Sequence, residues 1–474
     1  MKYLYSTMEE IVIETVETAR FFGLLSILPI AVIFVVSVIT KRTLFAMFCG
    51  VIAGALILSG GLTAFPSTFF GYIYKTFSDE TFQWIFMVVT FFGIIIALFE
   101  KSGAVMDFGL WITKFLKSKK QVLVGTFIFG LVVFVDDYLS NLTVGATMRK
   151  ITDRLKIPRT QLAYIVILMA GPISLLIPLS SWTAAYTGIF ETEGILVNGS
   201  PFVAFLHSIP LIFYAWVALI ICLLQIFGVI PKMGMIKKDY ARAESTGNVF
   251  PEGTTPPVLE AGAESADNAN PLPWNFLVPL AVIVVVTFLS GLDILFGTAA
   301  GTLTAFVLYL IERKAPFLDM LTTCYEGVIK IGLPLILFVL AFAIKAINDD
   351  TGMPPYIISV VEPLMKGSFL PLVVFLVCSV YAFFTGACWD LAMIIMPIVV
   401  PLSVTMGVDP VFTGAAVFSG GLFGNVFCPY GDGIILCAQA CEIRPIDLMF
   451  AIAPYMLIAG GVSAVLYFIT GFIF

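Results

Sequence analysis

Apolar stretches of about 18 or more residues recur along the whole chain, and they constrain its fold more than any other feature. A stretch of this length is what an α-helix needs to cross about 30 Å of lipid hydrocarbon. Charged residues make up only 12% of the 474 residues, whereas about 25% is usual in soluble domains. We therefore predict an all-α integral membrane protein with about ten transmembrane helices.

The apolar spans form two sets of five. They lie at about 22–40, 43–61, 83–100, 161–189 and 203–228, and again at about 275–292, 296–312, 327–347, 411–440 and 448–472. Two further apolar stretches, about 121–148 and 370–406, contain the polar runs DDYLSNLTVG and TGACWDLA. Because a continuous helix would bury these polar groups against lipid, we predict two re-entrant helical hairpins there.

The two sets of spans share one spacing. Stretches that start near 22, 43, 83 and 121 recur about 252 residues later along the chain. A shift of about 251 places Val135–Tyr138 on Gly386–Trp389, and it places Pro178 on Pro429. Since each half has five crossings, an odd number, the second repeat must be inverted relative to the first.

A long polar stretch, Lys232–Asn270, separates the two repeats and is rich in proline, threonine and acidic residues. This composition is typical of a solvated linker. We therefore divide the chain into a first inverted repeat (1–231), a polar cytoplasmic linker (232–273) and a second inverted repeat (274–474).

One span in each repeat is interrupted in its middle. Gly171-Pro172 and Pro178 lie within 161–189, and Gly420-Gly421 and Pro429 lie within 411–440. Proline removes a backbone donor and frees carbonyl groups one turn earlier in a helix. Both spans are therefore predicted to be broken helices whose gaps face the hairpin tips.

Charged residues predict the orientation. The basic loops include Lys41-Arg42, Lys101–Lys120, Arg149–Arg159 and Lys232–Arg242, whereas acidic loops occur at Glu191, Glu193, Asp349-Asp350 and Asp409. Because basic loops stay in the cytoplasm, we predict a multi-pass cell-membrane protein of a bacterial inner membrane, with both termini outside. Lys330 and Lys345 begin and end one predicted span, and we expect both side chains to extend to the membrane surfaces.

Several classes of function are disfavoured. The chain has no Lys/Arg-rich tract interleaved with aromatic residues, so it offers no nucleic-acid site. A single histidine, His207, and eight scattered cysteines without a CxxC pair do not indicate an enzyme. A channel would need a continuous polar lining or a charge ring, and none is visible. No cofactor is expected beyond sodium ions or protons as coupling ions.

The tip of the first predicted hairpin carries two carboxylates and several neutral oxygens. Hard cations such as sodium prefer oxygen ligands, and unwound backbone within a membrane can supply further carbonyl oxygens. The sequence therefore predicts a cation site at Asp136, Asp137, Ser140, Asn141 and Thr143. The alternative is that the two aspartates only cap the helix that starts near Leu139, because Asp favours the N-cap position.

The remaining polar residues at the interruptions are predicted to line a substrate cavity. They are Ser180, Ser181, Trp182, Thr385, Trp389, Asp390, Asn425, Tyr430 and Asp432. A carboxylate in a desolvated cavity can carry a coupling proton, and Asp390 and Asp432 are candidates for this role. Asp432 could instead be a turn residue that faces the cytoplasm.

The run FVDDYLSNLTVGATMRKITDRLKIPRTQLAYIVILMAGPISLLIPLSSW, residues 134–182, resembles the NhaC family of sodium/proton antiporters within the larger ion-transporter superfamily. The motifs VDDY, TVG, MRKITDR and PLSSW carry the resemblance, which extends more loosely to residues 381–432. The resemblance implies exchange of sodium for protons. It also implies an alternative, because relatives of this family include malate/lactate exchangers and amino-acid carriers.

The second half departs from the pattern of this family. Where the family has an acidic residue after a glycine and a run resembling SPxSDTT, the sequence reads Gly424-Asn425 and Cys428–Gly433. The lost carboxylate and hydroxyls favour a larger, less charged substrate. The leading interpretation is a sodium/proton antiporter that works by alternating access between its two repeats. The alternative is a sodium- or proton-coupled carrier of a small organic solute, an amino acid or a carboxylate, including organic-acid exchange.

The lipid bilayer is the expected surrounding of the whole chain. Small residues let helices approach closely in membranes, and Gly50–Ala55 is rich in glycine and alanine. Such a face could pack within one chain or between two, so the sequence leaves a homodimer open.

Overall fold

The computed structural model describes residues 22–40, 43–253, 272–290, 293–361, 366–386, 388–429 and 431–473. Within these ranges the chain consists of helices and connecting loops, and the one β-type pairing is an isolated bridge between Val197 and Ser200. The predicted all-α class is confirmed.

The helices of the first half run from the start of the described chain to the polar stretch. They are η1 (Gly23–Ile27), α2 (Leu28–Thr40), α3 (Thr43–Ser59), α4 (Phe65–Phe77), α5 (Glu80–Ser102), α6 (Ala104–Thr113), α7 (Lys119–Val132), α8 (Asp137–Arg154), α9 (Arg159–Leu176), α10 (Ser181–Thr192), α11 (Pro201–Ser208), η2 (Ile209–Leu211) and α12 (Phe213–Phe227).

A further helix and the second half follow. They are α13 (Gly234–Thr246), α14 (Trp274–Leu289), α15 (Ile294–Ile311), α16 (Phe317–Lys330), α17 (Gly332–Thr351), α18 (Met353–Val361), η5 (Gly367–Phe369), α19 (Leu370–Thr385), α20 (Trp389–Thr405), α21 (Pro410–Phe427), α22 (Asp432–Cys441) and α23 (Pro445–Thr470).

The helix positions repeat along the chain. Four consecutive helices of the first half, α7 to α10, begin 251 or 252 residues before four consecutive helices of the second half, α19 to α22. The paired first residues are Lys119 and Leu370, Asp137 and Trp389, Arg159 and Pro410, and Ser181 and Asp432. Each set comprises two helices of a hairpin followed by two helices of an interrupted span.

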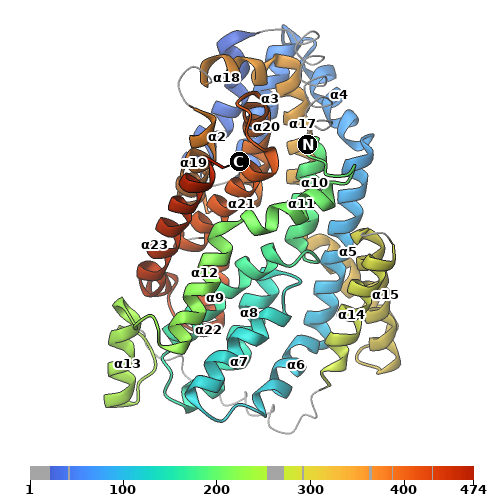
Figure 1. Ribbon diagram of the computed structural model, residues 1–474. Helices are drawn as coiled ribbons and strands as arrows, with labels where there is room; N and C mark the ends of the chain where they lie inside the picture. The colour runs from blue at the N-terminus through green and yellow to red at the C-terminus, as the bar shows by residue number, and fades with distance from the viewer. Residues whose placement is uncertain are drawn as a thin grey trace.

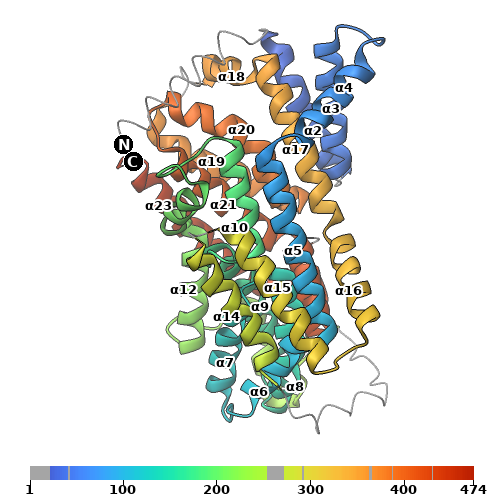
Figure 2. The ribbon, with the colours of Figure 1, turned by 90° about the vertical axis from the view of Figure 1, so that its right-hand side faces the viewer.

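The two hairpins lie toward opposite ends of the molecule. In both ribbon views the α7–α8 hairpin occupies the lower part and the α19–α20 hairpin the upper part (Figures 1 and 2). The basic segments that connect α6 to α7 and α8 to α9, together with α13, lie toward the lower end (Figure 1), whereas Lys41-Arg42 lies outside the described residues. Lys314 lies 3.6 Å from Asp107, and the Arg159 guanidinium lies 4.3 Å from the Phe250 ring centre. The lower end is called the basic end below.

Seven described helices are long and apolar enough to cross a membrane, and the bent pair α11–α12 would make an eighth. The number is below the predicted ten because several apolar helices are shorter than 18 residues, among them the parts of α3 and α14 that run from Leu44 to Ser59 and from Trp274 to Leu289. The helices of the two hairpins are also short, because the chain reverses in the middle of each apolar stretch.

The first helices of the two interrupted spans form the centre of the fold. The 18-residue window of α9 is 100% buried and that of α21 is 83% buried, whereas that of α15 is only 39% buried. A helix that is apolar and buried on all sides must be surrounded by other helices, while one with exposed apolar residues faces lipid. The two interrupted spans are therefore placed where a central site can form.

Glycines allow α21 to approach α19 closely. A Cβ at Gly420 would overlap the Phe375 carbonyl oxygen, and a Cβ at Gly424 would overlap that of Ser379. The two glycines are four residues apart on one face of α21, a spacing that lets membrane helices pack backbone to backbone. This contact joins the second hairpin to the second interrupted span.

The polar stretch after α12 is not a solvated linker over its whole length, which corrects the sequence interpretation. Its first part forms α13, with Ile236, Tyr240 and Ala243 buried on one face. Asp239 accepts a 2.7 Å hydrogen bond from the Thr160 hydroxyl at the start of α9. An apolar face at helical spacing and this bond fix α13 to the basic end. Residues 254–271 lie outside the described residues.

Candidate functional site

The first hairpin reverses through residues 133–136, which are not helical and connect α7 to α8. Asp136 is the N-cap of α8, and its Oδ1 atom accepts hydrogen bonds from the backbone NH groups of Tyr138 and Leu139, at 3.0 and 3.1 Å. The capping alternative is therefore correct for one oxygen of Asp136. The other carboxylate oxygen, Oδ2, does not take part in this cap.

That second oxygen is bound by the first interrupted span. The Ser181 hydroxyl donates a 2.9 Å hydrogen bond to Asp136 Oδ2, and the Ser181 backbone NH donates a 2.9 Å bond to the Val135 carbonyl. Ser180 caps α10 by accepting from the Thr183 backbone NH at 3.1 Å. The gap between α9 and α10 thus lies directly against the hairpin tip.

Asp137 is bound from the same helix. The indole Nε1 of Trp182 donates a 2.8 Å hydrogen bond to Asp137 Oδ1, and both side chains are buried. Asp136 and Asp137 therefore each accept a hydrogen bond from α10, which donates through two consecutive residues. The sequence assigned Ser181 and Trp182 to a substrate cavity and the aspartates to a cation site, but the structure brings these four residues into one network.

Two other tip residues have unused oxygens. Ser140 and Asn141 are each 1% exposed, and Ser140 Oγ and Asn141 Oδ1 have no hydrogen-bond partner among the described residues. Leaving a buried polar atom without a partner costs free energy, so such atoms mark places where a ligand or water would be stabilised. Thr143 is half-buried and points about 200° away from Asn141 around α8, so the structure does not bring it to this group.

The second half holds its own hairpin tip in a similar way. Asn425, near the end of α21, donates a 2.6 Å hydrogen bond from Nδ2 to the Gly386 carbonyl, which ends α19. Thr385 is buried, and its hydroxyl donates to the Tyr381 carbonyl of its own helix at 2.9 Å. Asn425 therefore positions the tip, while the Thr385 hydroxyl is used within α19.

The two halves meet at Gly433, in the first turn of α22. A Cβ placed on Gly433 would lie 3.7 Å from Asn141 Nδ2 and 3.9 Å from Asn425 Oδ1. A second contact joins Tyr186 of α10 to Cys388 at the second hairpin tip, with 3.6 Å between the hydroxyl oxygen and the sulfur. Polar interruptions from both repeats therefore face one another.

Four predicted residues cannot be placed in this network. Tyr430 and the side chains of Trp389, Asp390 and Asp432 lie outside the described residues. The backbone of Asp432 begins α22 and adjoins Gly433, which lies against the first hairpin.

Tyr186 and Thr187 belong to the same region but were not singled out from the sequence. Tyr186 stacks on Phe418 of α21 with ring centres 3.9 Å apart, and the buried Thr187 hydroxyl has no partner among the described residues. Tyr186 lies four residues after Trp182, so helical spacing places both on one face of α10. That spacing is the signal that could have indicated it.

The tip offers carboxylate, hydroxyl and amide oxygens. Among the described residues no three His, Cys, Asp or Glu side chains lie close enough together to hold a metal ion. A cation at the tip would instead use a carboxylate together with hydroxyl, amide and backbone oxygens, the ligand type of hard cations.

Two interrupted spans and two hairpins around a polar centre define a multi-pass secondary transporter. It is not an enzyme. Residues 200–472, more than half of the chain, match the Na+/H+ antiporter family, and the chain belongs to this family. This agrees with the resemblance drawn from residues 134–182.

One relative and two solved structures are similar to this chain over most of its length. An uncharacterised protein of Haemophilus influenzae Rd is 23% identical over 489 aligned positions, which cover 94% of this chain and 91% of that protein. Among solved structures, MtrF of Neisseria gonorrhoeae, described with a class of antimetabolite efflux pumps, has a TM-score of 0.59 at 16% identity, covering 87% of this chain and 85% of its own. The YdaH transporter of Alcanivorax borkumensis has a TM-score of 0.57 at 12% identity, covering 81% and 84%. At these identities the two structures show a shared fold.

Proposed function

We propose that this transporter exchanges sodium ions for protons, and that Asp136 and Asp137 bind one or the other. The observation that carries the proposal is the burial of both carboxylates, which are 8% and 6% exposed. Among the donors that the structure gives them are backbone NH groups, a serine hydroxyl and an indole NH. A charged carboxylate at this depth is costly unless a cation or a proton neutralises it.

Alternation between sodium and protons follows from this requirement. When Asp136 and Asp137 are charged, the unused oxygens of Ser140 and Asn141 offer further ligands for sodium. When a proton occupies a carboxylate, the local charge falls and sodium is released. Competition between the two cations for one site is sufficient to couple their opposite movements.

Alternating access is the mechanism we propose. The two hairpins and two interrupted spans meet at the centre, and moving them against the outer helices would open the site to one side and then the other. We propose that the basic end faces the cytoplasm of a bacterial cell, in agreement with the distribution of lysine and arginine. The division into repeats at 1–231 and 274–474, and a homodimer formed by outer helices, belong to the same proposal.

A second candidate is coupled transport of a small organic solute. The described second-half residues at the centre, Asn425, Gly433 and Cys388, are uncharged, which suits a larger neutral or anionic substrate. The fold shared with MtrF agrees with this alternative, because the class named for that protein exports antimetabolites.

Transport in liposomes tests the proposal. Purified protein is reconstituted with an internal pH dye, and proton movement is recorded after sodium is added outside. Sodium should drive proton movement in the parent protein, and Asp137→Asn should abolish it. Asp409→Asn is the matched control, because Asp409 caps α21 outside the site and asparagine caps helices well. Sodium-driven proton movement that persists in Asp137→Asn would contradict the proposal. Uptake of labelled amino acids or dicarboxylates without that movement would favour the second candidate.

A further inference from the structure

A lysine and a buried glutamate from the two halves meet away from the hairpin tips. Lys345, on α17, donates to the Thr192 carbonyl at the end of α10, and its Nζ lies 3.9 Å from Glu193 Oε1. The Glu193 side chain is only 6% exposed. Lys345 lies six residues before the end of α17 at Thr351. Our expectation that its side chain extends to a membrane surface stays a prediction.

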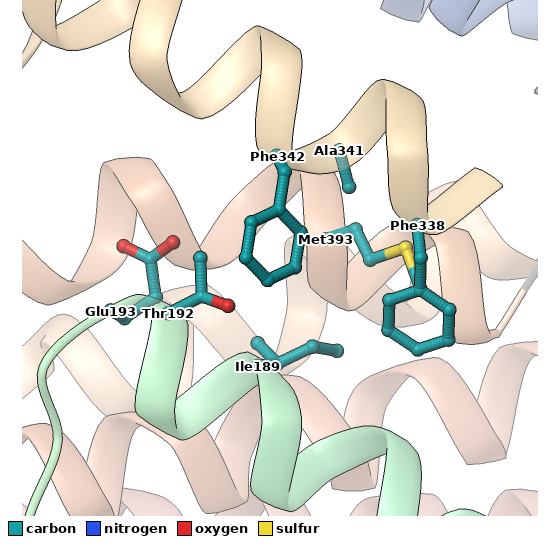
Figure 3. Close-up of a pocket in the computed structure, with 7 residues that line it drawn as sticks. All are labelled: Ile189, Thr192, Glu193, Phe338, Ala341, Phe342 and Met393. Atoms are coloured by element: carbon teal, nitrogen blue, oxygen red, sulfur yellow. The ribbon is translucent and has the colours of Figure 1, made fainter. Parts of the chain in front are cut away.

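A small cavity lies between these helices (Figure 3). Its lining comes from the end of α10, from α17 and from Met393 of α20, and it consists of Ile189, Thr192, Glu193, Phe338, Ala341, Phe342 and Met393. Glu193 is the one charged residue in this lining, and the cavity has room for about one water molecule. The joint between α10 and α17, with its cavity, is called the α10–α17 joint below.

The joint connects moving and static elements of the proposed mechanism. At its other end α10 begins with Ser181 and Trp182, which bind the tip carboxylates. On the opposite side, α17 packs mainly on α3 and α4, and less extensively on α20 of the second hairpin. A change at the α10–α17 joint would therefore be transmitted along α10 to the site.

Charged groups around Glu193 come mainly from α17. They are Lys345 and Asp349, and Asp349 is in turn near Asp350 and, from α4, Lys75. Of the helices that pack on α10, α11 carries His207, which is exposed and bonds to the Val203 carbonyl. Glu80 lies in the first turn of α5, Arg159 begins α9 at the basic end, and the Asp390 side chain of α20 lies outside the described residues.

Burial makes ionisation of Glu193 unfavourable in this arrangement. Burial raises the pKa of Glu193 to about 7, with Lys345 acting to lower this pKa and Asp349 acting to raise it. Contact with water would return the pKa toward its ordinary value of 4.5. A protonated Glu193 therefore favours the closed joint, and an ionised Glu193 favours a joint that is open to water.

We propose that Glu193 is a proton-binding site separate from Asp136 and Asp137, and that its protonation keeps the α10–α17 joint closed. The proposal rests on the proposed function only in assigning a role to joint opening during transport. Opening itself can be measured in protein that does not transport.

Thiol labelling measures the opening. Ala341 lines the cavity, so Ala341→Cys reports on its access to a membrane-impermeant maleimide, in a background where half-buried Cys49 and Cys324 are replaced by serine. Labelling is divided by that of Ser78→Cys, an exposed position, to remove the effect of pH on thiol reactivity. Between pH 6 and pH 8 this ratio should rise about fivefold or more.

Variants assign the rise to Glu193. With Glu193→Gln the ratio should stay low at every pH, whereas Glu191→Gln, two residues away on α10, should behave as the parent. Lys345→Gln should move the midpoint of the rise to higher pH, and Asp349→Asn should move it to lower pH, because these charges act on Glu193 in opposite directions. If Lys345 and Asp349 only supported the structure of the joint, the two variants would not move the pH midpoint in opposite directions.

The proposal is overturned if the parent shows no rise, or if Glu193→Gln keeps the same rise. Neither result depends on sodium-driven proton movement. A pH-dependent joint in a protein that lacks sodium transport would retain the Glu193 proposal and contradict the proposed function instead.

Discussion

The carbonyl oxygens of Val135 and Gly386, at positions 251 residues apart, are each bound by the interrupted span of their own half. Val135 accepts from the Ser181 backbone NH at 2.9 Å, and Gly386 accepts from Asn425 Nδ2 at 2.6 Å. Unwound backbone within a membrane is stable only where its polar groups have partners in the protein. The carbonyl at this position therefore has a hydrogen-bond donor in both repeats. The donor is a backbone NH in the first repeat and a side-chain amide in the second.

Replacing Ser181 by alanine should weaken sodium binding. The change removes the hydroxyl that donates to Asp136 Oδ2, and a hydrogen bond to a charged group contributes about 1.5–3 kcal/mol. The sodium concentration for half-maximal exchange should therefore rise about tenfold, measured in liposomes. Ser463→Ala is the control, since within the described part of the chain that buried hydroxyl bonds only to the Ala459 carbonyl of its own helix. Equal sodium dependence in Ser181→Ala and the parent would be inconsistent with this role.

Asn425→Leu should loosen the second hairpin tip. Leucine fills a similar volume but cannot donate to the Gly386 carbonyl, which would lose its partner at a cost of about 1–3 kcal/mol. We expect lower thermal stability in detergent and a loss of transport. Asn275→Leu removes a buried amide that binds Glu312 on the outer helices, so it should reduce stability with little effect on transport per folded molecule. Normal transport by Asn425→Leu would show that the tip does not need this anchor.

Gly424→Ala should destabilise the contact between α19 and α21. The added methyl would overlap the Ser379 carbonyl oxygen, which belongs to the backbone of α19 and cannot move independently. Overpacking of this kind costs about 1–3 kcal/mol. Gly461→Ala on α23 provides the comparison, because a Cβ there meets no atom within 4 Å. Thermal unfolding in detergent should separate the two variants, and equal melting temperatures would refute the packing argument.

Stability should depend on pH through Glu193. Its pKa is about 7 in the folded protein and 4.5 ordinarily, so between these values the folded state holds a proton that the unfolded state has lost. Stability from this group is therefore lost as pH rises from about 4.5 to 7, by on the order of 3 kcal/mol. Glu193→Gln has no ionisable group at this position, so this loss of stability does not occur in the variant. The melting temperature of the variant relative to the parent should rise over this range, and a constant or falling difference would contradict the assignment.

The sequence predicted the fold well because apolar length and polar interruptions are local features. The interruption at DDYLSN and the one at TGACWD are visible without knowing any contact, and the matching offset follows from counting. The apolar face of α13 is also a local feature of the sequence, but the segment is polar overall and was therefore interpreted as a linker. Only the spacing of Ile236, Tyr240 and Ala243 could have indicated a packed helix.

The arrangement within the site depends on contacts that the sequence does not specify. Ser181 and Asp136 are 45 residues apart, and Lys345 and Glu193 are 152 apart, so neither pairing could be read from spacing. Thr143 was grouped with Asn141 by proximity along the chain, although a helix turns them to different faces. The functional roles of the site residues stay predictions.

Proton release on sodium binding tests most directly whether the tip carboxylates hold either a sodium ion or a proton. Purified protein in weak buffer is mixed with sodium while the pH of the solution is recorded, with potassium as the control salt. The account predicts that sodium releases protons from the parent and releases none from the Asp136→Asn, Asp137→Asn double variant. Sodium binding without proton release by the parent, or unchanged release by the double variant, would contradict it.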